Sequence, residues 1–453
     1  MFVLKGLCCF VRLEQFLMRQ ISTDKKAKYI IGIGASAGGL EALKSMLSQA
    51  KPNRDMAYVV AQHLSPDYKS MMVELLQRNS KINVKQVKSG EEVYANTVYL
   101  IPPRKFLSVY HGKLILEDQP EGTRVLLPIN IFFRSLAKDF GSKAIAVILS
   151  GTGSDGSLGL KDIKEADGLV IAQSPTNAKF DGMPQSAIST GMVDMVLKAE
   201  EMIEYLDGFL KHPFAKTTKA LRTELDQSED SLTRIMLVIR DYCGVDFSFY
   251  KENTLIRRLE RRLGVNRVTS LSQYIKLLQE SDEEKETLFR EFLIGVTRFF
   301  RDEGAFNALS ALVFKKFLKS GKDQIRIWSV GCSTGEEAYS LAITLEEIMA
   351  ETNTQREYKI FATDIDRRAV EYASVGYYSD SLLSELEEVK LQRYFVKREA
   401  GWQIKEQIRQ RIIFAPHNVL KDPPFSKLDL IVTRNLFIYF KPESQERTLN
   451  KFH

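Results

Sequence analysis

The chain has 453 residues, of which 44% are apolar, and a formal net charge of +6. This length exceeds what one hydrophobic core usually serves, so we expect two or three domains, and no apolar run is long enough to span a membrane. Four cysteines form neither a C-x-x-C pair nor a Cys/His metal spacing, which excludes a disulfide scaffold and a zinc site and favours a reducing compartment.

Residues 1–27 form a leader for which the sequence predicts no function. Its apolar stretches are interrupted by Lys5, Arg12 and Glu14, and no small-residue cleavage site follows, so a signal peptide is not indicated. A weak membrane-surface helix is the alternative reading of this segment.

The first predicted strand begins near Ile30 and runs into a glycine-rich loop that precedes a helix. Residues 34–38 fit the G-x-S-x-G elbow that exposes a nucleophilic Ser36, whereas residues 32–37 fit a relaxed dinucleotide fingerprint, so a nicotinamide enzyme is the alternative. A dinucleotide site needs an acid after the next strand. The strand at 57–62 is followed instead by His63, which favours the serine nucleophile.

A third apolar strand, at 144–149, opens into a loop that carries Asp155. Because loops after neighbouring strands of a parallel sheet gather at one edge, these three side chains form a candidate triad. Ser36 would attack an acyl carbon, His63 would transfer its proton, and Asp155 would orient the imidazole. The backbone N–H groups of Ala37 and Thr152 are the candidate oxyanion donors.

From about residue 28 to 200 the chain resembles the catalytic domain of the chemotaxis protein-glutamate methylesterase (CheB-type) family. The resemblance implies a doubly wound parallel α/β domain with the same triad, which hydrolyses glutamyl methyl esters on receptor signalling helices without a cofactor. Thr152 stands where the family often has methionine, a change that leaves a backbone donor in place. The motifs are GASAGG at 34–39, QHLSP at 62–66, YLIPP at 99–103, SGTGSDG at 150–156 and DGMP at 181–184.

The pattern changes at 201–230, where we predict a linker, and residues 231–291 have the spacing of a small all-α domain. Within it, one helix has leucine and isoleucine on one face and arginines on the other. That basic face would bind phosphates or an acidic helix bundle, and a merely solvated surface is the alternative. Few aromatics accompany it, which argues against nucleic acid. Its residues are Arg257, Arg258, Arg261 and Arg262.

Residues 292–453 are predicted to form a second α/β domain. A strand at 325–330, in which Trp328 is a predicted core residue, leads into a glycine-containing loop, and the next strand ends in Asp364. A carboxylate there accepts ribose hydroxyls, and no P-loop lysine is present for a triphosphate. Glu336 and Glu337 would repel phosphate but could pair with an ammonium group, which suits S-adenosylmethionine (SAM).

From about residue 230 onward the chain resembles the chemotaxis receptor glutamate methyltransferase (CheR-type) family. The motifs lie at 296–302, 328–340, 362–366, 418–420 and 434–440. The resemblance implies that the arginine face docks receptor helices and that Arg301 and Tyr439 line the transfer site. Gly295 replaces the family's asparagine, so that contact is lost. The implied cofactor contacts are Thr297, Arg301, Glu337, Asp364, Asn418, Val419, Arg434 and Asn435.

After the strand at 429–432, residues 441–453 are too few for the three further strands of this methyltransferase fold. We therefore expect a Rossmann-like class I domain that is truncated and lacks its last strands. Its last strand would form an uncovered apolar edge, and SAM binding would be weakened or lost.

The sequence therefore predicts a cytoplasmic, bifunctional chemotaxis-type signalling enzyme. Its expected partners are the cytoplasmic helical domains of methyl-accepting chemoreceptors and also signalling kinases, with no nucleic acid and no membrane insertion. The alternative from another class is a regulatory scaffold that binds receptors or kinases with one or both active sites idle.

Overall fold

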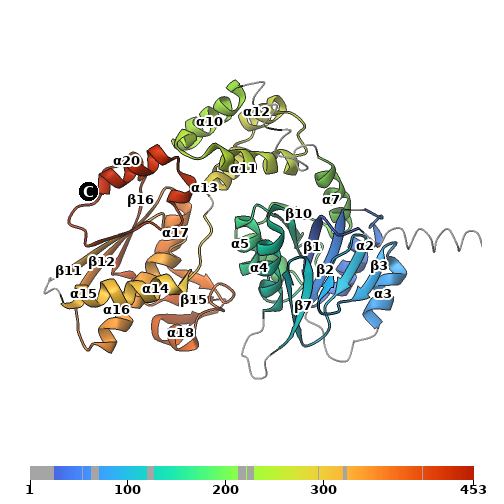
Figure 1. Ribbon diagram of the computed structural model, residues 1–453, viewed down its shortest axis with the longest axis horizontal. Coiled ribbons are helices and arrows are strands. Elements are labelled where there is room, and N and C mark those ends of the chain that lie inside the picture. The colour runs from blue at the N-terminus through green and yellow to red at the C-terminus, as the bar shows by residue number, and fades with distance from the viewer. Residues whose placement is uncertain are drawn as a thin grey trace, which may run out of the picture. The chain divides into compact units, whose positions relative to one another are not determined.

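The computed structural model describes residues 25–53, 55–62, 71–119, 127–212, 221, 229–293, 295–319, 324–399 and 401–452. The chain divides between His212 and Pro213 into two units, which we describe separately. Each unit contains its own parallel sheet (Figure 1). None of the helices in the described ranges is both long and apolar enough to cross a membrane.

A seven-stranded sheet forms the centre of the described part of unit 1. Its strands lie in the order β10-β9-β8-β1-β2-β5-β3, and every neighbouring pair is parallel. All residues of β1, β8 and β9 are buried, as expected for parallel strands covered on both faces. This confirms the predicted doubly wound α/β architecture. The strands are β1 (Tyr29–Ala35), β2 (Met56–Gln62), β3 (Asn83–Gln86), β5 (Thr97–Leu100), β8 (Ala144–Ile148), β9 (Leu169–Gln173) and β10 (Met195–Leu197).

Helices cover both faces of this sheet: α4 (Pro128–Phe140) and α5 (Ser157–Glu165) lie on one side, and α2 (Gly39–Ser48) and α3 (Met71–Asn79) on the other (Figure 1). Glycines in β1 let α4 pack closely. A Cβ on Gly32 would lie 2.8 Å from Phe132, and a Cβ on Gly34 would lie 2.6 Å from Ile129. These two glycines are therefore required by the packing between strand and helix.

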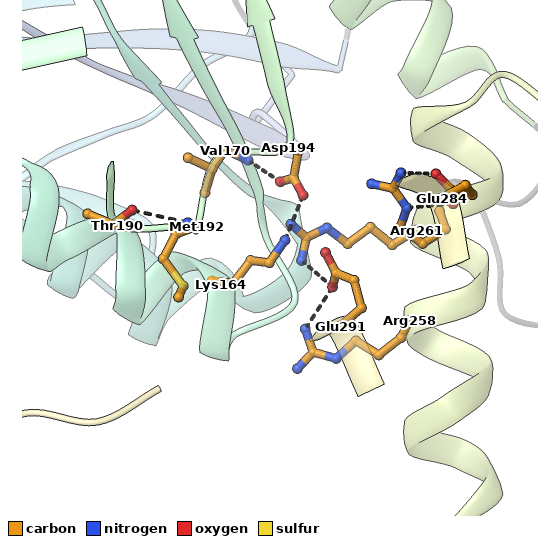
Figure 2. A network of polar contacts seen from close by, with 10 residues as sticks. Lys164, Val170, Thr190, Met192, Asp194, Arg258, Arg261, Glu284 and Glu291 are labelled. Atoms are coloured by element: carbon orange, nitrogen blue, oxygen red, sulfur yellow. Dashed lines mark hydrogen bonds and ion pairs between the residues drawn. The ribbon is translucent and has the colours of Figure 1, made fainter. Parts of the chain in front are cut away.

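Unit 1 also contains a small antiparallel sheet and a polar contact between α5 and the main sheet. An antiparallel sheet of β4 (Glu91–Glu92), β7 (Lys113–Asp118) and β6 (Lys105–Tyr110) packs on α4. Asp194, directly before β10, accepts hydrogen bonds from Lys164 Nζ (2.6 Å) and from the Val170 amide (2.8 Å). These bonds connect α5 to the sheet (Figure 2).

Part of the predicted 201–230 linker is a packed helix of unit 1. Residues Met202–Lys211 form α7, which follows α6 (Gly182–Ser189) and packs against α2. Met202, Leu206 and Leu210 are buried at four-residue intervals, which is the spacing of one helical face. The apolar period thus extends beyond the boundary that the sequence predicts at residue 200.

The first part of unit 2 is a helical subdomain, as predicted. Its helices are α10 (Glu229–Cys243), α11 (Glu252–Val265), α12 (Leu271–Glu280) and α13 (Asp282–Leu293), with a short 3₁₀ turn, η4 (Phe247–Phe249), before α11. Leu255, Leu259 and Leu263 are fully buried in its core, so the predicted apolar face of α11 is confirmed.

The second part of unit 2 is an α/β domain around a four-stranded parallel sheet in the order β16-β12-β11-β17. In chain order this is third, second, first and fourth strand, which is the order of a Rossmann-like half-sheet. The parallel strands are β11 (Gln324–Val330), β12 (Glu357–Asp364), β16 (Ile412–Pro416) and β17 (Leu430–Val432), and a small antiparallel sheet contains β13 (Tyr377–Ser379), β15 (Gly401–Ile404) and β14 (Phe395–Arg398). The helices are α14 (Glu303–Leu309), a π-helical turn η5 (Ser310–Phe314), α15 (Lys315–Lys319), α16 (Glu336–Glu351), α17 (Arg367–Val375), α18 (Glu388–Tyr394), α19 (Glu406–Arg409), the 3₁₀ turn η6 (Phe437–Tyr439) and α20 (Pro442–Phe452).

The face of the sheet beside β17 is covered. Among the described strands β17 pairs with β11 alone, so it does lie at an edge. However, α20 places Phe452 against Trp328 with ring centroids 5.3 Å apart, and Trp328 is fully buried as predicted. The expected apolar edge is thus present at β17, and α20 covers the adjacent face of the sheet with an aromatic side chain.

Candidate active sites at the strand ends

Ser36 lies between the end of β1 and the start of α2. Its amide donates to the carbonyl of Ser150 (3.0 Å), and its carbonyl accepts from Gly39 (2.9 Å). Gly38, with φ +73°, provides the left-handed turn that starts the helix. The loop thus holds a half-buried serine at the carboxyl end of a central strand, in the place where the sequence predicts a nucleophile.

The neighbouring strand brings the position of the predicted base alongside. In the β1–β2 register Ala35, the residue before Ser36, pairs with Gln62, the last residue of β2. Gln62 also donates from Nε2 to the Ser36 carbonyl (3.4 Å). His63 follows Gln62 directly but lies outside the described residues, and its role as base stays a prediction.

Asp155 lies in the loop after β8, the neighbour of β1 on its other side. The carboxylate is buried, with 5% of the residue exposed, and accepts hydrogen bonds from the amides of Ile129 (3.0 Å), Asn130 (3.1 Å) and Gly156 (2.8 Å). Two of these donors belong to the first turn of α4, where the helix dipole stabilises negative charge. These three hydrogen bonds fix the orientation of the Asp155 carboxylate.

The two candidate oxyanion donors follow Ser36 and Gly151 in the chain. Ala37 is half-buried and Thr152 is exposed, and neither amide donates a hydrogen bond to another residue within the part of the chain that the structure describes. A Cβ on Gly151 would lie 2.9 Å from Ser36 Cβ and 2.1 Å from Met183 Sδ, so this loop approaches the serine closely. The close approach requires glycine at position 151 and brings the adjacent Thr152 near the nucleophile.

Ser150 joins the loops around the serine. It is fully buried, and its hydroxyl lies 2.9 Å from the Ala37 carbonyl and 3.2 Å from the Phe180 carbonyl, either of which can accept its proton. The same oxygen accepts from the Phe180 amide (3.0 Å). One side chain thus fixes three loops, and the sequence analysis gave it no role because a buried loop serine has no sequence signature.

In unit 2, the loop after β11 is bound to the neighbouring strand β12. The amides of Gly331 (2.7 Å) and Cys332 (2.9 Å) donate to the Thr363 carbonyl, and the Ser333 amide donates to Asp364 Oδ2 (2.8 Å). The backbone amide of Asp366 donates to Oδ1 of the same carboxylate (3.0 Å). Each oxygen of Asp364 retains a lone pair for a further donor, and burial raises the pKa of this carboxyl.

Three of the predicted cofactor contacts meet at the start of α16. Arg434 Nη1 lies 3.5 Å from Glu337 Oε2, while Nη2 donates to the carbonyl of Arg301 (2.5 Å) and to Asp302 Oδ2 (2.7 Å). Glu337 also accepts from Ser329 Oγ (2.8 Å). Burial raises the pKa of Glu337 to about 7, against the opposing effects of Ser329, Arg434 and Arg301.

The other predicted contacts are distributed around this loop. Ser333 donates to the Gly295 carbonyl (2.9 Å), which holds the segment that contains Thr297 near the loop. Asn418 lies after β16, with its amide bonded to Asp422 (2.7 Å), and Val419 is buried. Asn435 is exposed with φ +58°. Tyr439 is half-buried, and its carbonyl accepts from Lys251 (2.8 Å).

Glu336 is buried, although its sequence context also allows a solvated side chain. It is 1% exposed, and Thr334 Oγ1 donates to its Oε2 (2.5 Å). Its carboxylate is therefore satisfied by the loop itself, and Glu337 is the one that faces Arg434.

A small cavity lies next to Ile365, the residue after Asp364. Its walls are aromatic and aliphatic, with the amide of Asn418 and the charged groups of Asp246 and Lys421, but the space is too small to hold a nucleoside base. The sequence analysis missed the residues that the helical subdomain supplies, because they reach this place only through tertiary packing. The lining residues are Val245, Asp246, Phe249, Tyr250, Ile365, Asn418, Leu420 and Lys421.

The predicted arginine face of α11 is largely engaged within unit 2. Arg262 makes a bidentate ion pair with Glu284, which also accepts from Tyr274 (2.6 Å). Arg258 (3.9 Å) and Arg261 (3.6 Å) contact Glu291, as Figure 2 shows. Arg257 is exposed. Three of the four arginines predicted to form a docking face are thus buried and paired with glutamates of α13, and the solvated alternative does not hold for them either.

Comparison with known proteins identifies both halves. Residues 31–206 match the family model of CheB methylesterase, residues 230–293 that of the CheR methyltransferase all-alpha domain, and residues 295–453 that of the CheR methyltransferase SAM binding domain.

Three relatives show how these matches extend. An uncharacterized 104.1 kDa protein in the hypE 3′ region of Rhodobacter capsulatus is 39% identical over 84% of the chain, which spans 42% of that protein. The chemotaxis protein methyltransferase of Listeria monocytogenes is 31% identical over 50% of the chain and 85% of its own length. A protein-glutamate methylesterase/protein-glutamine glutaminase of Photorhabdus laumondii is 33% identical over 38% of the chain and 50% of its own length. The chain therefore belongs, through its second half, to the chemotaxis methyltransferase family, and it carries a CheB methylesterase domain in its first half.

Proposed function

We propose that this protein is a bifunctional receptor-modifying enzyme that removes methyl groups from glutamyl esters with its first unit and adds them to glutamates with its second. The observation that supports the esterase half is the strand order. Ser36, His63 and Asp155 follow three adjacent parallel strands, and Asp155 is already fixed by three amide donors.

In the proposed reaction Ser36 Oγ attacks the ester carbonyl carbon while His63 takes the hydroxyl proton. The amides of Ala37 and Thr152 stabilise the negative charge that develops on the carbonyl oxygen. The ester C–O bond then breaks, and His63 returns the proton to the departing methoxide, which leaves as methanol. Water, deprotonated by His63, hydrolyses the acyl-serine to a glutamate carboxylate and free Ser36. No cofactor is required by these steps.

For the methyltransferase half, the residues present fit SAM, which supplies an activated methyl group on a sulfonium. Asp364 would hold the ribose hydroxyls. Glu337 would pair with the ammonium group. Thr297, Asn418, Val419, Arg434 and Asn435 complete the proposed binding set. Because the acceptor is a carboxylate, the main task of Arg301 and Tyr439 is to orient it toward the methyl carbon.

The proposed substrate is the cytoplasmic helical domain of a methyl-accepting chemoreceptor, and the proposed location is therefore the cytoplasm. Signalling kinases are a second proposed partner class. On α11 the exposed Arg257 is the arginine best placed to meet an acidic helix, since Arg262 is committed to Glu284. We therefore restrict the proposed docking role of the Arg257–Arg262 face chiefly to Arg257.

The test of the esterase proposal compares the full-length wild type with Ser36→Ala. The wild type should release methanol from a helical peptide that bears a glutamyl γ-methyl ester, and Ser36→Ala should reduce the rate by at least about 10³-fold. Ser48→Ala, a change at an exposed serine of the same loop-helix segment, should leave the rate unchanged. Absence of hydrolysis by the wild type, or equal rates in all three proteins, would contradict the proposal and favour a scaffold with idle sites.

A further inference from the structure

Phe180 is an exposed aromatic residue whose backbone is rigidly held. The residue is 41% exposed, yet its amide donates to Ser150 Oγ (3.0 Å) and its carbonyl accepts from the Gly151 amide (3.0 Å). Both hydrogen bonds end on the loop that approaches Ser36. The backbone that carries the ring is thus fixed relative to the loop of Ser36, although a large part of the residue is exposed.

The ring also borders the serine loop directly. A Cβ on Gly38 would lie 3.1 Å from Phe180 Cδ2, so the ring edge packs over the glycine two residues after Ser36. Ser150 reinforces this position, because its hydroxyl lies within hydrogen-bond distance of the carbonyls of both Ala37 and Phe180. The ring therefore forms part of the wall that an approaching ester would meet.

A held and exposed aromatic side chain is well suited to recognition. It offers a large apolar area at low conformational entropy cost, because its backbone is already ordered. If the ester is carried by a helix, the side chains three and four positions away lie on the same face. An aromatic ring beside the nucleophile can pack against an apolar member of that group while the ester enters the site.

We propose that Phe180 is a specificity-determining residue that contacts apolar side chains flanking the methyl ester on a helical protein substrate. This inference rests on the proposed esterase function and names the substrate feature that the site recognises. It assigns Phe180 no role in bond making or breaking. Loss of the ring should therefore weaken recognition of the helix and leave the chemistry of the ester unchanged.

The experiment compares two substrates that contain the same ester: a helical peptide with one glutamyl γ-methyl ester flanked by leucines at i+3 and i+4, and the N-acetyl amide of glutamate γ-methyl ester alone. Methanol release by the full chain gives kcat and KM for each. The wild type should prefer the peptide. Phe180→Ala should lower kcat/KM for the peptide at least tenfold, mainly through KM, and change the value for the minimal ester less than twofold. Phe180→Tyr should retain most of the peptide activity.

Tyr110→Ala is the matched control, because Tyr110 is an exposed aromatic of the same unit. The amide of the next residue, His111, donates to Asp139 near the last turn of α4, whereas Asp155 contacts the first turn of that helix. The control should leave both substrates unaffected. Equal losses on both substrates with Phe180→Ala would show a packing role, and no loss on either would show no role, so both outcomes would overturn the inference. A wild type that hydrolyses neither ester would instead refute the proposed function itself.

Discussion

The loop after β1 in unit 1 and the loop after β11 in unit 2 have similar geometry but different neighbours. Each leaves a buried central strand and enters a helix through a left-handed glycine, Gly38 (φ +73°) in one and Gly335 (φ +94°) in the other. The first loop is bound toward β8, because Ser36 donates to Ser150. The second is bound toward β12, because Ser333 donates to Asp364.

This difference shows that two similar loops can differ in the side chains that the neighbouring strand places beside them. In unit 1 the adjacent strand β2 ends at Gln62, which has no carboxylate to hold a ribose, and Ser36 lies in the loop after β1. In unit 2 the adjacent strand ends in a carboxylate that both orients the loop and offers lone pairs to a ligand. We propose that the same backbone arrangement presents an attacking group in unit 1 and a binding site in unit 2.

The largest expected effect on this comparison comes from a substitution at Asp155 in unit 1. Asp155→Asn should reduce ester hydrolysis by about 10⁴-fold in kcat, because an amide at this position would stabilise the wrong tautomer of His63. SAM binding should not change. Asp139→Asn is the control, since Asp139 accepts amide hydrogen bonds from His111 (2.8 Å) and Gly112 (2.7 Å) near the other end of α4. If Asp139→Asn lowered the rate as much as Asp155→Asn, the assignment of the triad would be lost.

A smaller effect is expected from Asp364→Asn in unit 2. Loss of a charged acceptor for the ribose hydroxyls should weaken SAM about 10- to 100-fold, in line with the strength of hydrogen bonds to ionised groups. Isothermal titration of the full chain measures this, and ester hydrolysis should be unchanged. Asp366→Asn is the matched control, because Asp366 caps α17 through the amides of Arg368 and Ala369, a role that asparagine also fills. An unchanged SAM affinity in Asp364→Asn would remove the proposed ligand from this loop.

The smallest expected effect concerns pH. Because burial raises the pKa of Glu337 to about 7, the carboxyl is mostly neutral at pH 5.5 and mostly ionised at pH 7.5. SAM affinity should rise roughly tenfold over this interval as the anionic partner of the ammonium forms. Glu337→Gln should remove the rise, whereas Glu346→Gln on the same helix should keep it. A pH profile that is identical in wild type and Glu337→Gln would contradict the assignment.

The same group should affect stability in the opposite direction. A folded-state pKa raised from 4.5 to about 7 means that the neutral carboxyl favours folding. This contribution is complete below pH 4.5 and is lost as pH rises through about 7. The Tm of the ligand-free protein should therefore fall over this interval relative to Glu337→Gln, while the Tm increase caused by SAM grows.

Much of the fold was accessible from the sequence because it depends on local patterns. Apolar runs predicted the central strands of both sheets, and the chemical roles predicted for Asp155 and Asp364 stay predictions. The leucine face of α11 was equally evident from its period. Even α7 carried a readable signal in Met202, Leu206 and Leu210, which the predicted boundary at residue 200 ignored.

The remainder depended on partners distant in the chain. Nothing around Arg262 indicates that Glu284, 22 residues away, would pair with it. Similarly, the hydroxyl of Ser150 is significant only because Ala37 and Phe180 approach it from other loops. The burial of Glu336 follows from the fold of its own loop, which composition does not reveal. Such features arise from the assembled structure and not from periodicity.

One long-range contact has a consequence for how the protein is made. Tyr250, just before α11, forms an antiparallel bridge with Phe440. Two backbone hydrogen bonds accompany this bridge: the Lys251 amide donates to the Tyr439 carbonyl (2.8 Å), and the Lys441 amide donates to the Phe249 carbonyl (2.9 Å). At a synthesis rate of about 5–20 residues per second, Phe440 is added on the order of 10 to 40 s after Tyr250. During that interval the helical subdomain lacks a wall of its core, since Phe440 and Trp328 belong to the same buried cluster. We therefore expect the helical subdomain to complete its folding only after Phe440 has been synthesised. Unit 1, in contrast, can finish folding while the rest of the chain is still being synthesised.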